Sequence, residues 1–196
     1  MSYNLIRPFL FKKDPEEAHE LTLEILKKVH GSIKLKKIMK AQGYNEETAV
    51  SSLRNLKSII ADELWKNSNI VDALNYLENC LPDDDVEYTP CHTDLHKDNW
   101  LLSNQGKLFL VDWEHSILCD PAIDISFVLY RYIPQSDWNE WLEIYGQEPT
   151  IKYRNRLKWY ITLQSMIMIV WYHEKKQLSE MNSWLVFLDS VFNDFI

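Results

Sequence analysis

Residues 91–124 read CHTDLHKDNWLLSNQGKLFLVDWEHSILCDPAID, and this polar stretch surrounds a run with β-strand composition, Lys107–Val111. A second such run, Val86–Thr89, comes just before the stretch. Asn104-Gln105-Gly106 has the composition of a hairpin turn. We therefore expect the two runs to form a small antiparallel β-hairpin with polar loops at the ends of its strands.

Polar side chains follow each of these strands. His92, Asp94 and Asn99 lie in the loop after the first strand, and Asp112 comes directly after the second. Because a hairpin brings its two ends together, we expect Asn99 and Asp112 to lie close to each other. A carboxylate beside an amide oxygen suits Mg²⁺, and Asp94 would stand next to the ion as a general base. A base and a magnesium ion are what phosphoryl transfer requires.

The rest of the chain has the pattern of a mainly helical protein. Asp14-Pro15-Glu16-Glu17 combines a capping residue, a proline suited to the first helical position and a glutamate three residues after the cap, and Gly31 can end the helix. Ser136 and Thr150 are expected to cap two later helices. Besides 14–30, helices are predicted at 46–66, 70–81, 122–132, 137–145, 151–173 and 177–196. The large aromatic residues near the C-terminus are expected to pack in the core: Trp159, Trp171 and Trp184.

Composition limits the class of protein. The chain has 196 residues, of which 46% are hydrophobic, and its net charge is −8, so we expect one globular domain with its own core. The acidic balance argues against a nucleic-acid-binding protein, which normally carries a basic patch. Three cysteines without a CxxC pair favour reduced thiols and a cytoplasmic protein. No run has the length or apolar composition of a membrane span or a signal peptide, so no membrane association is expected.

The polar stretch resembles the aminoglycoside phosphotransferase and choline kinase family, a branch of the kinase-like enzymes. Members typically have a catalytic loop H-G-D-L-H-x-x-N, which resembles His92–Asn99, and a metal motif I-D-W-E or V-D-W-D, which resembles Val111–Glu114. The resemblance implies a kinase-like C-terminal lobe in which Asp94 and His92 are catalytic. It further implies that Asn99 and Asp112 bind Mg²⁺, with ATP or GTP as phosphate donor.

Other residues extend the resemblance. His96 and Glu114 distinguish this branch from the protein kinases and are expected to support the metal and base residues without binding the ion. The segment Asp120-Pro121-Ala122-Ile123-Asp124 is similar to the family's D-x-x-x-D, in which the second aspartate buttresses the catalytic loop, whereas Asp120 is expected to cap a helix. The ending Leu-Lys-Lys-Val-His30 is similar to an L-x-x-L-H helix of these enzymes. Thr93 departs from the family's glycine, which would matter if φ is positive there.

Within the family, the most similar group that we identify is that of the CcrZ-like cell-cycle-regulator phosphotransferases of Gram-positive bacteria. The similarity includes Trp138-xx-Trp141-Leu-xx-Tyr145-Gly146 and extends from Arg7 over most of the chain. It implies a sugar or nucleoside kinase with a link to replication control. The acidic residues, of which 16 of the 29 lie between residues 41 and 125, suit a cationic acceptor, but metal and base roles already account for the carboxylates at the site. The acceptor is therefore left open among sugar, nucleoside, aminoglycoside and choline-like hydroxyls.

A kinase-like enzyme also needs an N-lobe with a glycine-rich phosphate loop and a strand lysine. The four glycines of this sequence stand singly: Gly31, Gly43, Gly106 and Gly146. We therefore interpret residues 1–13 as a hinge or linker remnant and residues 14–196 as the C-terminal lobe. Two hypotheses stay open. The chain is either a catalytic lobe whose N-lobe is truncated or supplied by a partner, or an inactive kinase-like binding or regulatory module.

A different chemistry is also compatible with the motif. His92-x-Asp94-x-His96 presents three side chains that could bind zinc in a metallohydrolase. Such sites usually recruit further His or Cys ligands, and His115 is the one other histidine nearby. We expect His115 to lie on the surface, so this alternative is the weaker one.

Overall fold

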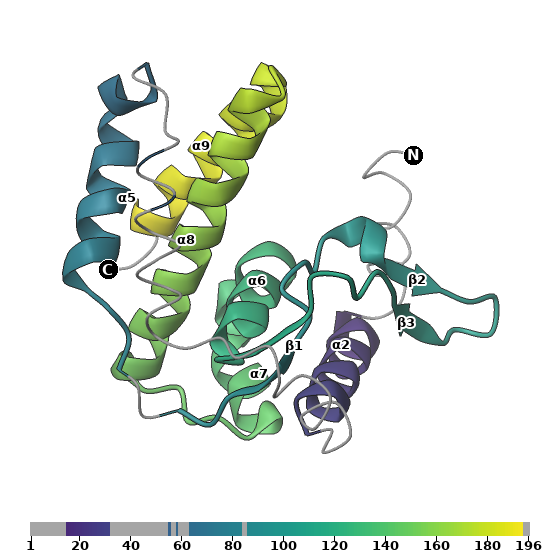
Figure 1. The fold of residues 1–196 in the computed structure, drawn as a ribbon. Coiled ribbons are helices and arrows are strands. Elements are labelled where there is room, and N and C mark those ends of the chain that lie inside the picture. The colour runs from purple at the N-terminus through teal and green to yellow at the C-terminus, as the bar shows by residue number, and fades with distance from the viewer. Residues whose placement is uncertain (1–14, 32–54, 56–57, 59–62, 84–85, 194–196) are drawn as a thin grey trace. The chain divides into compact units, whose positions relative to one another are not determined.

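The computed structural model describes residues 15–31, 55, 58, 63–83 and 86–193 (Figure 1). The chain forms two compact units, each made of two separate stretches of sequence. The first unit comprises Met1–Tyr44 and Glu87–Thr150, and the second comprises Asn45–Val86 and Ile151–Ile196. The polar stretch that contains the predicted site lies entirely in the first unit.

The first unit begins with helix α2, Pro15–His30, where a helix was predicted. Gly31 follows the helix, and its N–H donates to the carbonyl of Lys27. Helix α2 packs against strand β1 (Thr89–Cys91), strand β3 (Leu108–Leu110) and helix α7 (Trp138–Tyr145) of the same unit. The predicted cap Asp14 and the predicted hinge at residues 1–13 lie outside the described residues.

The β structure of this unit differs in part from the prediction. Strand β2 (Trp100–Leu102) pairs antiparallel with strand β3 (Leu108–Leu110) across the predicted turn, where Gly106 has a φ of 78°. The prediction that Val86–Thr89 pairs with this strand was wrong. Only Thr89 of that run is in a strand, β1 (Thr89–Cys91), which pairs with the unpredicted strand β4 (Ile117–Cys119). Trp100–Leu102 form the hairpin with β3 in place of Val86–Thr89, because the loop from Leu102 to Leu108 is shorter and costs less entropy to close.

Helices α6 (Ala122–Tyr132) and α7 (Trp138–Tyr145) complete the first unit near the predicted positions. The prediction that Ser136 caps α7 was wrong. Its hydroxyl donates to the Asp137 carboxylate, and Gln135–Asp137 form a short 3₁₀ helix before α7 begins. Gly146 ends α7 with a φ of 99°, a left-handed conformation that glycine adopts without a steric cost.

The second unit is a group of packed helices: α5 (Ser68–Asn79), α8 (Ile151–Glu174) and α9 (Leu178–Asn193). The Asn67 side chain caps α5 by accepting the Asn69 N–H. Most of the predicted helix 46–66 lies outside the described residues, and Leu64–Lys66 form a 3₁₀ helix. Trp159 and Trp184 are buried as expected, but the prediction for Trp171 was wrong. Trp171 is 45% exposed, and its ring lies beside Lys175 and Tyr172.

The fold class is therefore confirmed as mainly helical with a small amount of β structure. Two two-stranded sheets carry the polar loops of the first unit. Among the helices of the described ranges, none combines the length and the apolar composition that crossing a bilayer requires.

Candidate active site

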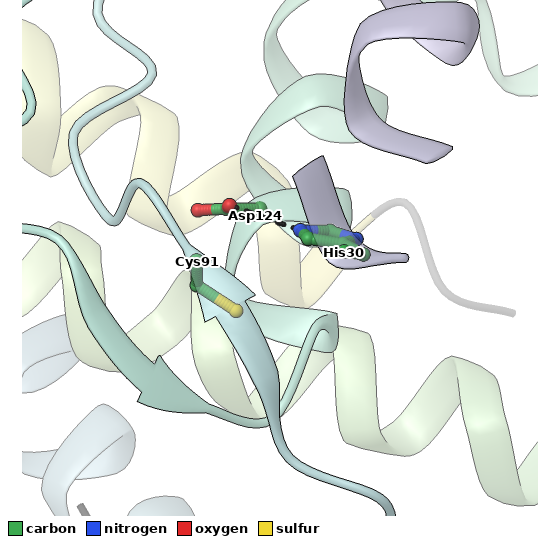
Figure 2. Close-up of side chains that lie close together, drawn as sticks. All are labelled: His30, Cys91 and Asp124. Carbon is green, nitrogen blue, oxygen red and sulfur yellow. Dashed lines mark hydrogen bonds and ion pairs between the residues drawn. The ribbon is translucent and has the colours of Figure 1, made fainter. Parts of the chain in front are cut away.

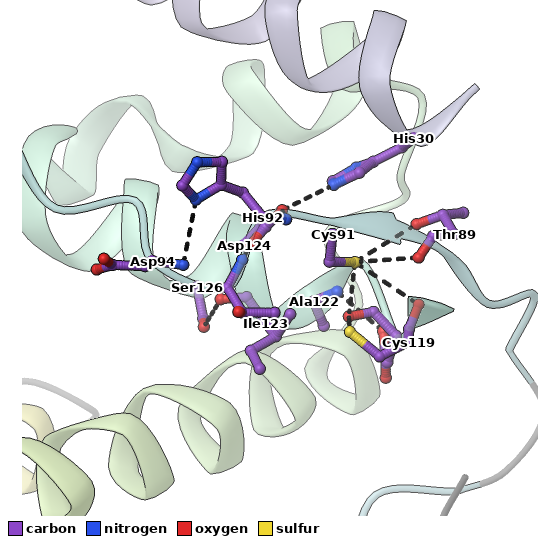
Figure 3. Close-up of polar contacts among 12 residues, drawn as sticks. His30, Thr89, Cys91, His92, Asp94, Cys119, Ala122, Ile123, Asp124 and Ser126 are labelled. Carbon is purple, nitrogen blue, oxygen red and sulfur yellow. Dashed lines mark hydrogen bonds and ion pairs between the residues drawn. The ribbon is translucent and has the colours of Figure 1, made fainter. Parts of the chain in front are cut away.

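The carboxylate of Asp124 holds the start of the catalytic-loop motif (Figure 3). Its Oδ2 accepts the His92 N–H at 2.8 Å, and its Oδ1 accepts the Thr93 N–H at 2.8 Å. Asp124 lies in the first turn of α6 and is only 1% exposed. The neighbouring Asp120 accepts the Ala122 N–H at the start of the same helix. Asp124 thus ties two consecutive loop residues to α6 through their main chain.

His92 connects the loop to the strand that precedes Asp112. Its Nε2 lies 2.8 Å from the Val111 carbonyl oxygen, and its Nδ1 lies 3.3 Å from the Asp94 backbone nitrogen. Because a carbonyl can only accept, Nε2 carries the proton and Nδ1 accepts the Asp94 N–H. The ring is fully buried against Trp113. Both of its ring nitrogens are thus used in hydrogen bonds inside the protein.

Asp94 and Asn99 form a direct pair. The Asn99 Nδ2 donates to the Asp94 main-chain carbonyl at 2.8 Å and to its Oδ2 at 3.0 Å. Both partners are acceptors, which assigns the nitrogen of the amide to Asp94 and leaves the Asn99 Oδ1 for another partner. Asn99 is buried, whereas Asp94 is partly exposed. This geometry lets Asp94 accept a proton from a solvent-accessible hydroxyl.

The hairpin brings Asp112 to the same place. The Val111 N–H donates to the Asn99 main-chain carbonyl at 2.9 Å. Asp112, the next residue after Val111, therefore follows directly on the residue that pairs with the end of the loop. Asp112 is exposed and has a φ of 64°. The available oxygens here are the Asn99 amide oxygen and the Asp112 carboxylate, a hard-oxygen donor set that fits Mg²⁺.

The remaining predicted residues lie nearer to solvent. The His96 Nδ1 lies 3.3 Å from the Asp98 Oδ2. The His115 Nε2 lies 3.3 Å from the Glu114 Oε1, and both side chains are exposed, as expected for His115 on the surface. Glu114 therefore points to solvent in this structure.

The hydrogen bonds of His30 to Asp124 and Tyr145 were not predicted from the sequence. The His30 Nε2 lies 3.2 Å from the Asp124 Oδ2, and the His30 Nδ1 lies 2.6 Å from the Tyr145 hydroxyl. Burial lowers the pKa of His30, but its interactions with Asp124 and with the nearby Cys91 outweigh this effect and raise the pKa to about 9. His30 is therefore a buried imidazolium at neutral pH, donating to both partners. The L-x-x-L-H resemblance was the signal in the sequence.

His30, Cys91 and Asp124 form the one group of metal-ligating side chains that converges within the described ranges (Figure 2). Each already has hydrogen-bond partners. Asp124 accepts three N–H groups, and the Cys91 thiol contacts the carbonyls of Thr89, Cys119 and Asp120 (Figure 3). Burial raises the pKa of this thiol, which keeps it protonated. The cluster is therefore a hydrogen-bonded support for the loop.

The geometry also weakens the zinc alternative. His92 uses both ring nitrogens within the protein, so it has no lone pair to offer an ion together with Asp94 and His96.

Comparison with known proteins gives a consistent picture. Residues 4–160 match the sequence pattern of a family described as the phosphotransferase enzyme family. Protein LicA of Haemophilus influenzae is 31% identical over 105 residues, which is 49% of this chain and 30% of LicA. A dihydroorotate dehydrogenase (quinone) of Psychrobacter sp. is 45% identical over 74 residues, 38% of this chain and 21% of that enzyme. The chain thus spans less than a third of either curated relative.

Solved structures share the fold. The choline kinase LicA from Streptococcus pneumoniae superposes with a TM-score of 0.63 at 22% identity, over 88% of this chain and 63% of that one. A spectinomycin phosphotransferase in complex with ADP and spectinomycin gives a TM-score of 0.63 at 17% identity, over 88% and 64%. Both neighbours are longer than the superposed region.

Proposed function

The chain belongs to the phosphotransferase enzyme family, and from this premise we propose that it transfers the γ-phosphate of ATP, or of GTP, to a hydroxyl of a small-molecule acceptor. The observation that carries the proposal is the Asp94–Asn99 pair. Asn99 donates to Asp94 through its amide nitrogen, so a partly exposed carboxylate and an available amide oxygen stand side by side. This is the relation between base and metal ligand that phosphoryl transfer needs.

The roles of the residues follow from their contacts. Asp94 accepts the proton of the acceptor hydroxyl, whose oxygen then attacks the γ-phosphorus while the bond from that phosphorus to the leaving nucleoside diphosphate, ADP or GDP, breaks. Asn99 and Asp112 would hold Mg²⁺, which when bound neutralises charge on the phosphates. His92 and Asp124 keep the Asp94 main chain in place through their hydrogen bonds. Phosphate-binding residues of an N-lobe, from the same protein or from a partner, would complete the site.

Binding of a nucleotide is the first test. Adding ADP and MgCl₂ together is expected to raise the free energy of unfolding, by about 2.7 kcal/mol at a hundredfold excess over the dissociation constant. The Asp112→Asn variant should lose the magnesium-dependent part of this gain. Asp72→Asn, an exposed aspartate on α5, is the matched control and should keep it.

Transfer is the second test. Asp94→Asn should retain binding of ADP with Mg²⁺ while losing phosphate transfer by at least about 100-fold, because the amide cannot take the proton. Unchanged transfer in this variant would exclude Asp94 as the base.

We propose a cationic, choline-like alcohol as the acceptor. Support comes from the similarity to LicA, a choline kinase in Streptococcus pneumoniae, and from the acidic residues that surround the site in the sequence. If a screen of alcohols found transfer to sugars, nucleosides or aminoglycosides alone, one of these compounds would be the acceptor instead. A link to cell-cycle control belongs with the sugar or nucleoside alternative.

The second candidate function is a kinase-like module that binds or regulates without transfer. It is favoured by the four glycines of the sequence, which stand singly and do not form a glycine-rich phosphate loop. A chain that shows no stabilisation by ADP with Mg²⁺ would support this candidate and contradict the first.

A further inference from the structure

Thr93 has a backbone conformation that its residue type disfavours. Its φ is 65°, in the left-handed region, where a β-branched side chain is strained. Glycine would adopt this conformation without strain. The threonine side chain makes this backbone conformation less favourable than a glycine would, so the contacts of the side chain bear on why a threonine is present.

The contacts of Thr93 complement those of His92. Both N–H groups are held by the Asp124 carboxylate, one on each oxygen. The His92 ring donates to the Val111 carbonyl at 2.8 Å, and the Thr93 hydroxyl donates to the His115 carbonyl at 2.9 Å. The side chains of two consecutive loop residues thus bind two main-chain carbonyls, those of Val111 and His115.

These two points lie on either side of Asp112. Asp112 itself has a left-handed φ of 64°, which is also uncommon for a residue other than glycine. The segment after it is a turn closed by hydrogen bonds from the Ser116 N–H and hydroxyl to the Trp113 carbonyl. His92 therefore fixes the main chain before Asp112, and Thr93 fixes the turn that follows it.

We propose that Thr93 is a positioning residue, whose hydroxyl ties the turn after Asp112 to the catalytic loop and so presets the Asp112 carboxylate relative to Asp94 and Asn99. The proposal rests on the proposed function for its consequence in magnesium binding. The tie itself is a property of the chain without ligands. The hydrogen bond joins the loop that contains Thr93 to the turn after Asp112 before the nucleotide binds.

The test compares three variants of Thr93 in the full chain. Thr93→Val keeps the β-branching and its strain but removes the hydroxyl. Thr93→Ser keeps the hydroxyl, and Thr93→Gly removes both the hydroxyl and the strain. Hydrogen exchange of the amides of residues 111–117 is measured without ligand, and MgCl₂ is titrated in the presence of ADP, with thermal unfolding as a check on folding.

We expect Thr93→Val to speed exchange at residues 111–117 about fivefold and to raise the half-saturating Mg²⁺ concentration about fivefold, as expected for one lost hydrogen bond. Thr93→Ser should restore both. Thr93→Gly should unfold at the same or a higher temperature while still binding Mg²⁺ more weakly. This separation of stability from Mg²⁺ affinity distinguishes positioning from a merely structural role.

Two results would overturn the proposal. One is unchanged exchange at residues 111–117 in Thr93→Val. The other is a Mg²⁺ affinity that follows stability, so that Thr93→Gly binds as well as the parent. If the parent shows no response to ADP with Mg²⁺, the proposed function fails, and the exchange measurement alone decides whether the tie exists.

Discussion

The Asp124 carboxylate is where several hydrogen bonds of the site meet. It accepts two backbone N–H groups of the catalytic loop and pairs with the buried His30. Asp124→Asn removes the charge and replaces one acceptor oxygen by a donor that faces another N–H. We expect it to lower the free energy of unfolding by about 3 kcal/mol, measured by urea denaturation. A loss as small as that of Asp72→Asn would contradict this account.

The His30 to Asp124 pair makes stability depend on pH. The pKa of His30 is about 9 when folded and 6.5 is its ordinary value, so its contribution is fully present below pH 6.5 and is lost as the pH rises through 9. The other groups that face it are Asp124, Cys91 and Tyr145. Burial raises the pKa values of the Cys91 thiol and the Tyr145 hydroxyl. Neither of these groups is therefore expected to ionise below pH 9.

Unfolding free energies measured from pH 6 to 8.5, below the ordinary pKa of a cysteine thiol, should therefore fall by on the order of 2 to 3 kcal/mol in the parent chain. The decline should be absent in His30→Gln, which has no titrating ring. An equal decline in both proteins would place the responsible group elsewhere.

At the residue scale, the site divides into a part that could be predicted and a part that could not. His92, Asp94, Asn99 and Asp112 could be singled out because their chemistry and spacing lie within one short stretch. The bond between His30 and Tyr145 joins residues 115 apart in sequence, so only the packing of α2 against α7 reveals it. The burial of the His92 ring and its hydrogen bond to the Val111 carbonyl also needed the structure, because they depend on how the loop packs against the hairpin.

At the scale of elements, the helices were more predictable than the strands. Helix α6 matches its predicted bounds because its capping and apolar signals are local. Each strand has only three residues, and the pairing of β1 with β4 joins Thr89 to Cys119 across the whole polar stretch. Such a short strand has almost no pattern of its own, so tertiary contacts decide its partner.

The end of helix α7 gives a prediction at this scale. Gly146 has a φ of 99°, and a methyl group added there would meet no atom within 4 Å. The cost of Gly146→Ala is therefore backbone strain alone, about 1 kcal/mol in the free energy of unfolding. Gly146→Asn should cost less, because asparagine tolerates the left-handed region better. Equal losses for the two variants, by urea denaturation, would contradict this explanation.

At the scale of the whole molecule, each unit combines two stretches that are far apart in the chain. Along the sequence, the polar stretch comes between the two parts of the second unit, which are residues 45–86 and 151–196. No local signal in the sequence marks such an interleaved arrangement, because composition and periodicity describe neighbours along the chain. The family resemblance could be recognised from the sequence, because its main motifs are local and lie within residues 92–124.

The charge of the whole chain predicts how an acceptor binds. The net charge is −8, and its potential attracts a cation and leaves a neutral alcohol unaffected. If the acceptor is choline-like, its apparent affinity should fall severalfold between about 20 and 200 mM NaCl, over which the Debye length shrinks from roughly 20 to 7 Å. Binding of a neutral sugar alcohol should change less than about twofold over the same range.

Neutralising the exposed Glu114 by Glu114→Gln should reduce the salt effect for choline alone. Choline affinity that ignores salt would show that the acidic residues do not select the acceptor, and a neutral acceptor would then be favoured.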